Sequence, residues 1–300
     1  MIEVRGLSKR YGPTVAVDGL SFDVRPGVVT GFLGPNGSGK STTMRLMLDL
    51  DTPDAGQVRI DGRRYRELRW PLREVGALLE ARSFHPGRSA RAHLAALAAS
   101  NGIGRARVEE VLELVGLAGV AGRRAGRFSL GMGQRLGIAA ALLGDPDVLL
   151  LDEPVNGLDP EGIRWVRELL RDLADEGRTA LVSSHLMSEM EDTADHLVVL
   201  GRGRLLADVP MADLLERTAA VRVRTPQGPL LASAMQRAGG SVALEIDGSL
   251  RVDGLDAEQV GDIAFELGVR LHELTRVTPS LEEAYLQLTG DEVEYRAGWP

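Results

Sequence analysis

A glycine-rich loop near the N-terminus limits what this chain can fold into: Gly34-Pro35-Asn36-Gly37-Ser38-Gly39-Lys40-Ser41. The run matches the G-x-x-x-x-G-K-S/T pattern of a phosphate-binding loop. Residues 28–33 before it read as a buried strand, and residues 41–48 after it read as a helix. Only two of the chain's 35 basic side chains are lysines, and one of them is Lys40. A strand, this loop and a helix in succession predict a binding site for a nucleoside triphosphate.

The residue types in the loop suit phosphate. Glycine allows a positive φ and lets the backbone approach an oxyanion closely, and the following helix adds its positive end. We expect Lys40 to reach the β- and γ-phosphates as a point charge and the Ser41 hydroxyl to bind Mg²⁺. The alternative is a glycine-rich turn that binds nothing. The full spacing match and the strand and helix around it favour phosphate binding.

Length and charge set further bounds. A chain of 300 residues is expected to form two domains. The absence of cysteine excludes disulfides and thiolate metal sites, which fits a reducing compartment. The start of the chain reads as a strand and not as a signal peptide, and no apolar stretch approaches the roughly 18 residues of a membrane helix. We therefore expect any membrane role to depend on a partner. The net charge of −8 argues against nucleic acid as the main ligand.

Strand-like and helix-like segments alternate through the first two thirds of the chain. Their order predicts an α/β core with a parallel sheet, and an alanine-rich helical stretch, about residues 86–145, reads as an inserted layer. Predicted strands cover 2–4, 21–24, 28–33, 57–60, 147–152, 179–183 and 197–200, and predicted helices include 90–100, 107–115, 163–175 and a short one ending at 217.

The pattern of predicted strands and helices changes near residue 219. Short strands are predicted at 221–224, 242–246 and 250–252, with helices at 230–237 and 257–267. A last helix is predicted to begin at Ser280, which forms a capping box with Glu283. We therefore expect a nucleotide-binding domain over 1–218 and a small α+β accessory domain over 219–300.

A second apolar strand, Val148-Leu149-Leu150-Leu151, delivers two adjacent acids, Asp152 and Glu153. The first acid can hold the shell of Mg²⁺, as a Walker-B aspartate does. The second points elsewhere and can polarise an attacking water. A strand that simply ends in solvated acids is the alternative, and the upstream phosphate loop makes it the weaker interpretation.

These motifs, with four more, resemble the ATP-binding subunit of an ABC transporter over roughly residues 2 to 210. Phe128-Ser129-Leu130-Gly131-Met132 stands where that family has its signature Leu-Ser-Gly-Gly-Gln, and Asn156-Gly157-Leu158-Asp159 resembles the D-loop. Ser183-Ser184-His185 resembles the segment of the switch histidine, and Tyr11 sits where the family stacks an aromatic ring on adenine. All these elements occur in the family's order.

The resemblance implies a fold and a set of roles. The fold is a P-loop NTPase core with a mixed sheet and an inserted helical subdomain. Glu153 and His185 would be catalytic, and Mg²⁺ would be held by Ser41, Glu80 and Asp152. ATP would be bound by Tyr11, Gly34, Pro35, Asn36, Gly37, Ser38, Gly39, Lys40, Ser41, Thr42, Ser129, Gly131 and Asp159, with the signature residues facing the γ-phosphate held by the other subunit.

Each of the smaller motifs also has an ordinary structural interpretation. Ser129 begins a helix and can be a simple N-cap, His185 can be a surface histidine, and Tyr11 can be ordinary packing. Their place in the family's order favours the functional interpretation. The remaining histidines have no ligand-like neighbours and are assigned no role, and the arginines between 63 and 69 read as a solvated face.

Three positions depart from the family pattern. Leu130 replaces the first glycine of the signature, and Met132 replaces its glutamine. Glu80, in Val75-Gly76-Ala77-Leu78-Leu79-Glu80, occupies the place of the Q-loop glutamine that meets Mg²⁺ and senses the transport partner. A carboxylate can ligate Mg²⁺. Changes of this kind are similar to those in the bacitracin and daunorubicin efflux ATPases.

The resemblance therefore predicts an ATP-hydrolysing subunit that dimerises around two ATP, as a homodimer or pseudo-dimer. This subunit would drive a separate transmembrane permease. The departures from the family pattern favour export of drugs or related hydrophobic compounds. The subunit would lie in the cytoplasm on the inner face of the cell membrane. One alternative is a soluble ABC-type ATPase acting on translation or DNA. A single phosphate loop, and seven arginines against thirteen acids beyond residue 220, disfavour it. Another alternative, a module that senses ATP without hydrolysing it, is opposed by Glu153.

Overall fold

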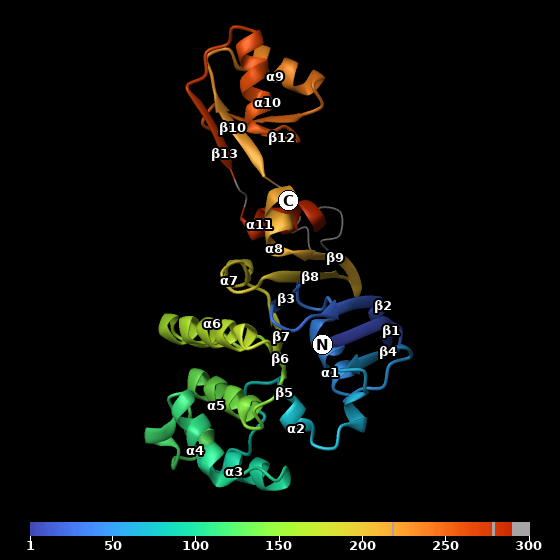
Figure 1. Cartoon of the computed structure of the whole chain (residues 1–300), viewed down its shortest axis with the longest axis vertical. Coiled ribbons are helices and arrows are strands. Elements are labelled where there is room, and N and C mark those ends of the chain that lie inside the picture. Colours follow the sequence, from blue (N-terminus) through green and yellow to red (C-terminus); the bar gives the residue numbers. More distant parts are fainter. Residues whose placement is uncertain (218, 278–279, 290–300) are drawn as a thin grey trace, which may run out of the picture. The chain divides into compact units, whose positions relative to one another are not determined.

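The computed structural model describes residues 1–217, 219–277 and 280–289, with side chains omitted at 217 and 286–289. The chain divides into two compact units, Met1–Val209 and one that begins at Pro210. Each is described separately below, and Figure 1 shows the elements of both. In the described part of the chain, no helix combines the length and the apolar character that crossing a membrane requires.

A six-stranded sheet forms the centre of the first unit, in the order β5-β6-β7-β3-β8-β9. The pairs β5–β6, β6–β7, β7–β3 and β3–β8 are parallel. A two-residue connection joins β8 to the neighbouring β9 and reverses the direction of the chain. The bounds are β3 Val29–Leu33, β5 Val75–Leu78, β6 Val148–Asp152, β7 Thr179–Ser184, β8 His196–Gly201 and β9 Arg204–Pro210.

The register of these strands decides where the functional side chains meet. Asp152 pairs with Ser183, and Leu33 pairs with Ser184, so β6, β7 and β3 end at the same edge of the sheet. All residues of β3 and β7 are buried, as expected for strands covered on both faces. The loops that follow β3, β6 and β7 therefore begin side by side.

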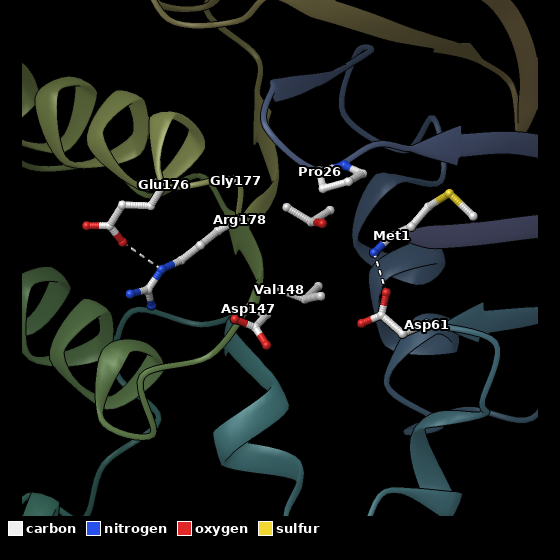
Figure 2. A pocket seen from close by; sticks show the side chains of 9 residues that line it. Met1, Pro26, Asp61, Asp147, Val148, Glu176, Gly177 and Arg178 are labelled. Carbon is white, nitrogen blue, oxygen red and sulfur yellow. Dashed lines mark hydrogen bonds and ion pairs between the residues drawn. The ribbon is translucent and has the colours of Figure 1, made fainter.

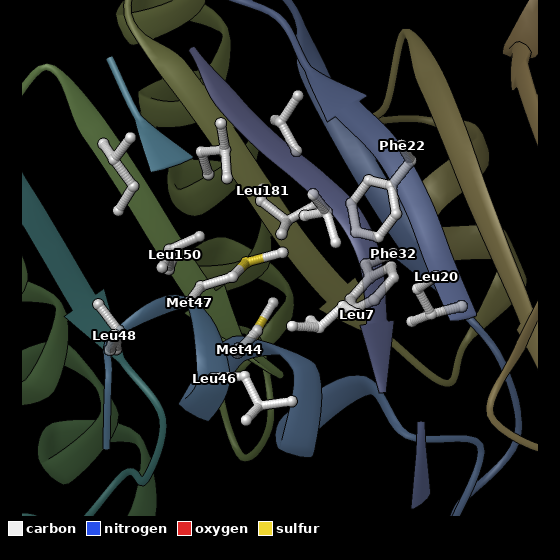
Figure 3. Packing of buried hydrophobic residues seen from close by; sticks show 14 of the residues in the cluster. Leu7, Leu20, Phe22, Phe32, Met44, Leu46, Met47, Leu48, Leu150 and Leu181 are labelled. Carbon is white, nitrogen blue, oxygen red and sulfur yellow. The ribbon is translucent and has the colours of Figure 1, made fainter. Parts of the chain in front are cut away.

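A three-stranded antiparallel sheet, in the order β2-β1-β4, covers helix α1 from the other side. The main hydrophobic core joins both sheets to this helix (Figure 3). Met44 and Met47 of α1 pack in it, and the rings of Phe22 and Phe32 lie 5.6 Å apart between their centroids. This core fixes the helix that follows the glycine-rich loop. The bounds are β1 Ile2–Tyr11, β2 Thr14–Val24, β4 Ala55–Ile60 and α1 Lys40–Met47.

The expected helical layer is present between β5 and β6, where α3, α4 and α5 contact one another (Figure 1). Ser89 caps α3 by accepting a hydrogen bond from the Ala92 N–H, and α5 packs on β5. Helix α6 follows β6 and packs on β7 and β3. The bounds are α2 Pro71–Glu74, α3 Ala90–Ser100, α4 Arg105–Leu114, α5 Leu130–Leu142, α6 Pro160–Asp175 and α7 Met187–Glu191.

The second unit contains an antiparallel sheet in the order β11-β12-β10-β13. Helices α9 and α10 pack on it through a core that includes Leu231, Met235 and Val260. The predicted capping box is confirmed, since Ser280 and Glu283 exchange hydrogen bonds at the start of α11. The bounds are α8 Met211–Arg217, β10 Ala220–Arg224, α9 Gly228–Arg237, β11 Ser241–Leu244, β12 Leu250–Asp253, α10 Ala257–Glu266, β13 Glu273–Val277 and α11 Leu281–Thr289.

The structure differs from the sequence expectations at three strands and at the boundary between the units. Strands β5, β9 and β13 were not predicted. We expected the first domain to extend to residue 218, whereas the compact units divide after Val209. Helix α8 falls in the second unit because it contacts α11.

Candidate functional site

The glycine-rich loop connects β3 to α1 and has little room for side chains. Gly39 has φ of +104°, and a Cβ there would lie 2.5 Å from the Ala16 carbonyl oxygen. Gly34 has φ of +155°, and its Cβ would lie 2.6 Å from the Leu200 carbonyl oxygen. Because both positions combine a left-handed backbone with close carbonyls, glycine is required at each. The loop is thereby held against β2 and β8, with Pro35 and Asn36 exposed.

Lys40 is enclosed by this loop. Its ammonium donates hydrogen bonds to the carbonyl oxygens of Gly34, at 2.6 Å, and Pro35, at 3.2 Å, and the residue is only 6% exposed. Burial lowers the pKa of Lys40, and the negative charges of Glu153 and Asp152 oppose that shift. A buried cation thus faces the acids at the end of β6. Such a cation is stabilised further by any anion that enters the loop.

The hydroxyl groups of the loop are suited to an additional ligand. The Ser38 Oγ is buried and has no hydrogen-bond partner among the described residues. Ser41 is exposed at the start of α1, and Thr42 beside it is half-buried. Thr43, by contrast, donates to the Gly39 carbonyl oxygen at 2.8 Å and serves the helix. A triphosphate with its metal would supply partners for Ser38 and Ser41.

Asp152 and Glu153 lie beside the loop and share one buried serine. Ser183 of β7 donates a hydrogen bond to the Asp152 carboxylate and accepts one from the Glu153 backbone N–H at 3.0 Å. Ser183 is completely buried. Glu153 has φ of +51°, which turns its side chain away from the line of the strand. The two acids therefore point to different places, as the sequence predicted for them.

Three polar side chains contact Glu153, two of them at its carboxylate and one at its backbone. His185 Nδ1 lies 2.7 Å from Glu153 Oε2, and Asn156 donates to the same oxygen at 3.5 Å. Gln134 of α5 donates to the Glu153 backbone carbonyl at 2.9 Å. His185 thus contacts the acid directly, and its contact with a γ-phosphate stays a prediction. These contacts fix Glu153 as an acceptor at the edge of the site.

The signature residues and the D-loop form a separate hollow of about 440 Å³. Ser129 caps α5 by accepting a hydrogen bond from the Met132 N–H at 3.2 Å, and Asp159 caps α6 by accepting from the Gly162 N–H at 3.0 Å. A Cβ on Gly131 would lie 2.8 Å from the Gly157 carbonyl oxygen. In the part of the chain that the structure describes, no hydrogen bond joins this hollow to the phosphate loop. The signature hollow and the phosphate loop are therefore separate features of the described chain.

Tyr11 is held by residues that the sequence did not single out. It is 47% exposed, and its hydroxyl donates to Asp51 Oδ2 at 2.8 Å. Arg45 of α1 donates to the same carboxylate oxygen at 2.7 Å. Burial and the bond to Asp51 raise the pKa of Tyr11. The ring is therefore anchored to the helix that follows the phosphate loop, with one part open to solvent.

Glu80 is exposed two residues after β5. Its backbone carbonyl accepts a hydrogen bond from the Ser83 hydroxyl at 3.1 Å. Its charge acts on Arg45, whose pKa is raised chiefly by Asp51 and additionally by Glu80. Within the described residues, no group of three or more His, Asp or Glu side chains is arranged to hold a metal ion by itself. Mg²⁺ commonly takes one or two carboxylates together with phosphate oxygens, so Glu80 and Asp152 can act only as part of such a set.

A second hollow of about 440 Å³ lies at the opposite edge of the parallel sheet (Figure 2). It is lined by Asp147 and Val148 at the start of β6 and by Thr179 at the start of β7. The N-terminal amine of Met1 pairs with Asp61 there, at 2.6 Å. None of the predicted site residues lines this hollow, and its charged groups other than Asp147 are paired with one another, Met1 with Asp61 and Arg178 with Glu176. The phosphate-loop edge is therefore the candidate site.

Comparisons with known proteins agree with this geometry. A family model described as ABC transporter matches residues 17–156, and one described as a domain of unknown function matches residues 219–282. The bacitracin transport ATP-binding protein BcrA of Bacillus licheniformis is 43% identical over 220 residues, 72% of this chain and 72% of that protein. The protein of the same name from Enterococcus faecalis is 35% identical over 298 residues, 97% of this chain and 96% of that protein.

The solved structures include an ATP-binding subunit of an ABC transporter with a TM-score of 0.66 and 28% identity, covering 72% of this chain and 92% of that one. The predicted α/β fold of a P-loop NTPase with an inserted helical layer is confirmed. The predicted resemblance to bacitracin exporter ATPases is confirmed as well. The chain belongs to the ABC transporter family of ATP-binding proteins.

Proposed function

We propose that this chain is the ATP-hydrolysing subunit of an exporter, pairing with a second nucleotide-binding chain around two ATP and powering a separate transmembrane permease. One observation carries the proposal: the enclosed ammonium of Lys40 faces the Asp152–Glu153 pair at the strand edge from which the phosphate loop begins. In this proposal, Lys40 would be the phosphate-binding cation and Glu153 the general base, on the same side of the sheet. A soluble ATPase acting on translation or DNA is less consistent, because the relatives that match are named for transport.

The residues present fit ATP and Mg²⁺. The backbone of the loop from Gly34 to Gly39, together with Lys40, would hold the phosphates, and Tyr11 would stack on adenine. Ser41 and Asp152 would bind Mg²⁺, with Glu80 as a further ligand. The buried, unpartnered Ser38 Oγ and the lowered pKa of Lys40 support this assignment, because both are conditions that a bound anion relieves. When bound, the metal neutralises the charge on the transferred phosphate.

Glu153 is proposed as the acceptor of the proton from the attacking water. Its carboxylate is held by His185 and Asn156, and its backbone by Ser183 and Gln134, so it is oriented before substrate arrives. Preorganisation of this kind lowers the barrier because no reorientation is needed during the reaction. His185 would share its ring nitrogens between Glu153 and the γ-phosphate.

The signature hollow is proposed to complete the site of a second chain. The N-terminus of α5, with Ser129 and Gly131, offers backbone N–H groups to an anion. Asp159 caps the neighbouring α6 and fixes the D-loop beside it. Because this hollow and the phosphate loop are not joined within one chain, two copies facing each other would form two complete sites.

Export is proposed from the similarity to proteins named for bacitracin transport. The permease would hold the cargo site, and this chain would lie on the cytoplasmic face of the membrane through that partner. The first test is phosphate release by the purified chain with Mg-ATP, followed by co-purification with a membrane protein of about six hydrophobic spans encoded next to it. Absence of nucleotide hydrolysis in both the free and the co-purified protein would refute the proposal.

Ser183→Ala tests the support of the two acids. The substitution leaves the half-buried Asp152 carboxylate and the Glu153 N–H without this partner, and an unsatisfied buried group costs about 1–3 kcal/mol of folding free energy. We expect lower stability in a urea titration and ATP turnover reduced by about tenfold, because Glu153 loses a contact that holds its unusual backbone.

Ser249→Ala is the matched control for Ser183→Ala. Ser249 is also completely buried and donates a hydrogen bond to an aspartate, Asp247, but it lies in the second unit. This variant should lose less stability than Ser183→Ala, because water can replace the Ser249 hydroxyl beside the exposed Asp247 carboxylate, and its turnover should equal that of the parent. Equal turnover in both variants would show that Ser183 supports the fold and not the site.

Glu80→Gln tests the proposed metal contact by restoring the residue usual in the family. If Glu80 ligates Mg²⁺ directly, loss of its negative charge shifts half-activation to higher Mg²⁺. We expect a modest shift, because Ser41, Asp152 and the phosphates supply other ligands, together with altered stimulation by the permease. The measurement is an Mg²⁺ titration of ATPase activity with and without permease. Identical curves for parent and variant in both conditions would exclude Glu80 from both roles.

A further inference from the structure

The turn that carries His185 is closed by the side chain of the residue before it, Ser184. The Ser184 hydroxyl accepts a hydrogen bond from the Leu186 N–H at 2.9 Å, so this bond spans His185. The hydroxyl has one hydrogen to donate, and Glu189 Oε2 lies 3.1 Å away, nearer than the Leu186 carbonyl oxygen at 3.3 Å. An ionised carboxylate is also the stronger acceptor. Glu189 therefore completes the hydrogen bonding of this turn.

Glu189 lies close to the proposed catalytic groups. It is half-buried in α7, the short helix that follows the turn, and Ser184 beneath it is completely buried at the end of β7. Burial raises the pKa of Glu189, the hydrogen bond from Ser184 opposes this rise, and the negative charge of Glu153 adds to it. His185 also acts on Glu189 by its charge. The two carboxylates thus lie on either side of one histidine turn.

The position of the His185 ring depends on this turn. Its Nδ1 lies 2.7 Å from Glu153 Oε2, and because an ionised carboxylate only accepts, Nδ1 carries the hydrogen of this bond. Nε2 then remains for the γ-phosphate contact of the proposed function. The side chain of His185 is 41% exposed, so packing holds little of it in place. The backbone turn between Ser184 and Leu186 therefore decides where Nε2 lies.

We propose that Glu189 is a positioning residue for ATP hydrolysis, which fixes the turn of His185 by accepting the Ser184 hydrogen bond. The inference rests on the proposed function for the roles of His185 and Glu153, and it adds an acid that acts through Ser184. Such support matters because a displacement of about 1 Å at a reacting group can cost about 100-fold in rate.

The ordinary alternative is that Glu189 only stabilises α7. Thr193 separates the two interpretations, because its buried hydroxyl donates to the Glu189 backbone carbonyl at 2.7 Å. This second bond holds the same residue of the helix without involving the Glu189 carboxylate or Ser184. Loss of the Thr193 bond should therefore weaken α7 and leave the histidine turn closed.

The first test measures turnover. Glu189→Met removes the acceptor and keeps an unbranched side chain of similar length. We expect turnover to fall about tenfold with the KM for Mg-ATP within about twofold of the parent, because the loss falls on the transition state. Glu189→Gln keeps an oxygen that can accept from Ser184 and should stay within about threefold of the parent. The control Thr193→Val should lower stability in a urea titration and keep the parent turnover.

The second test does not require hydrolysis. The ring nitrogens of the five histidines are observed by NMR in the full chain labelled at histidine, and His185→Gln identifies the signal of His185. Without nucleotide, Glu189→Met should move that signal, whereas Thr193→Val should leave it in place. Ser184→Ala removes the same hydrogen bond from its other end and should also move the signal, so it replaces Glu189→Met if that variant does not fold.

An unmoved His185 signal in Glu189→Met and Ser184→Ala would overturn the proposal. Equal losses of turnover in Glu189→Met and Thr193→Val would overturn it too, because α7 as a whole would then position the ring. A parent chain that hydrolyses no ATP, with the His185 signal moved by Glu189→Met and not by Thr193→Val, would refute the proposed function. The positioning of His185 by Glu189 would still hold in that case.

Discussion

Glu153→Gln is expected to abolish most ATP hydrolysis while leaving nucleotide binding intact. The substitution removes the carboxylate that accepts the proton of water but keeps a side chain of the same shape beside His185 and Asn156. General bases contribute about 10²–10⁴-fold to such reactions, so turnover measured as phosphate release should fall by that factor. Because ATP would persist in the site, the variant should also accumulate as an ATP-bound dimer visible by gel filtration.

Glu161→Gln serves as the control for this variant. Glu161 is an exposed acid in the first turn of α6, eight residues further along the chain. Its replacement should leave turnover near that of the parent. Hydrolysis by Glu153→Gln at a rate close to that of the parent would show that another group accepts the proton.

Lys40→Ala is expected to remove nucleotide binding itself. The ammonium would neutralise the β- and γ-phosphates in both the ground state and the transition state, so its loss affects affinity as well as turnover. Mg-ATP at 100 times its dissociation constant stabilises a protein by about 2.7 kcal/mol, and this stabilisation should disappear from thermal unfolding curves. Without nucleotide the variant should unfold at nearly the parent temperature, because burial already disfavours the charged form of Lys40.

Lys9→Ala is the matched control, since Lys9 is the chain's second lysine and lies in β1. Its ammonium donates to the Thr52 carbonyl at 2.6 Å and lies outside the phosphate loop. The control should retain stabilisation by Mg-ATP. If Lys40→Ala were stabilised by Mg-ATP as strongly as the parent, the phosphate loop would not be the binding site.

The elements that sequence predicted best are those with buried, continuous apolar patterns. Strands β6 and β7 were found because nearly all their residues are buried, and α3 was predicted with its observed bounds. Strand β13 was missed because three of its five residues are exposed at the edge of the second sheet, so no alternation of apolar residues marks it. Strand β9 directly follows the Arg202-Gly203 turn, and such a turn is a sequence signal for a hairpin strand.

The predicted site residues that share a local motif were easier to identify than their supporting groups. Asp152 and Glu153 follow an apolar strand, whereas Ser183 lies 31 residues from Asp152 and meets it only through the register of β6 with β7. Asp51, which anchors Tyr11, lies 40 residues from it and carries no motif. Contacts between distant segments depend on tertiary packing, and a single sequence does not encode them in a readable pattern.

Two chains are proposed to complete each other's nucleotide sites, and mixing two inactive variants tests this most directly. Lys40→Ala keeps the signature hollow, while Gly131→Asp keeps the phosphate loop and puts a negative charge where the γ-phosphate of the second chain would lie. Each variant alone should be inactive. Mixed in equal amounts, about a quarter of the sites should be complete, because half of the pairs are mixed and each has one intact site.

The measurement is phosphate release from the mixture, compared with each variant at the same total concentration. Activity is expected to return on mixing, up to about a quarter of the parent rate. A mixture as inactive as its components, with both variants folded by circular dichroism and able to associate by gel filtration, would contradict a composite site.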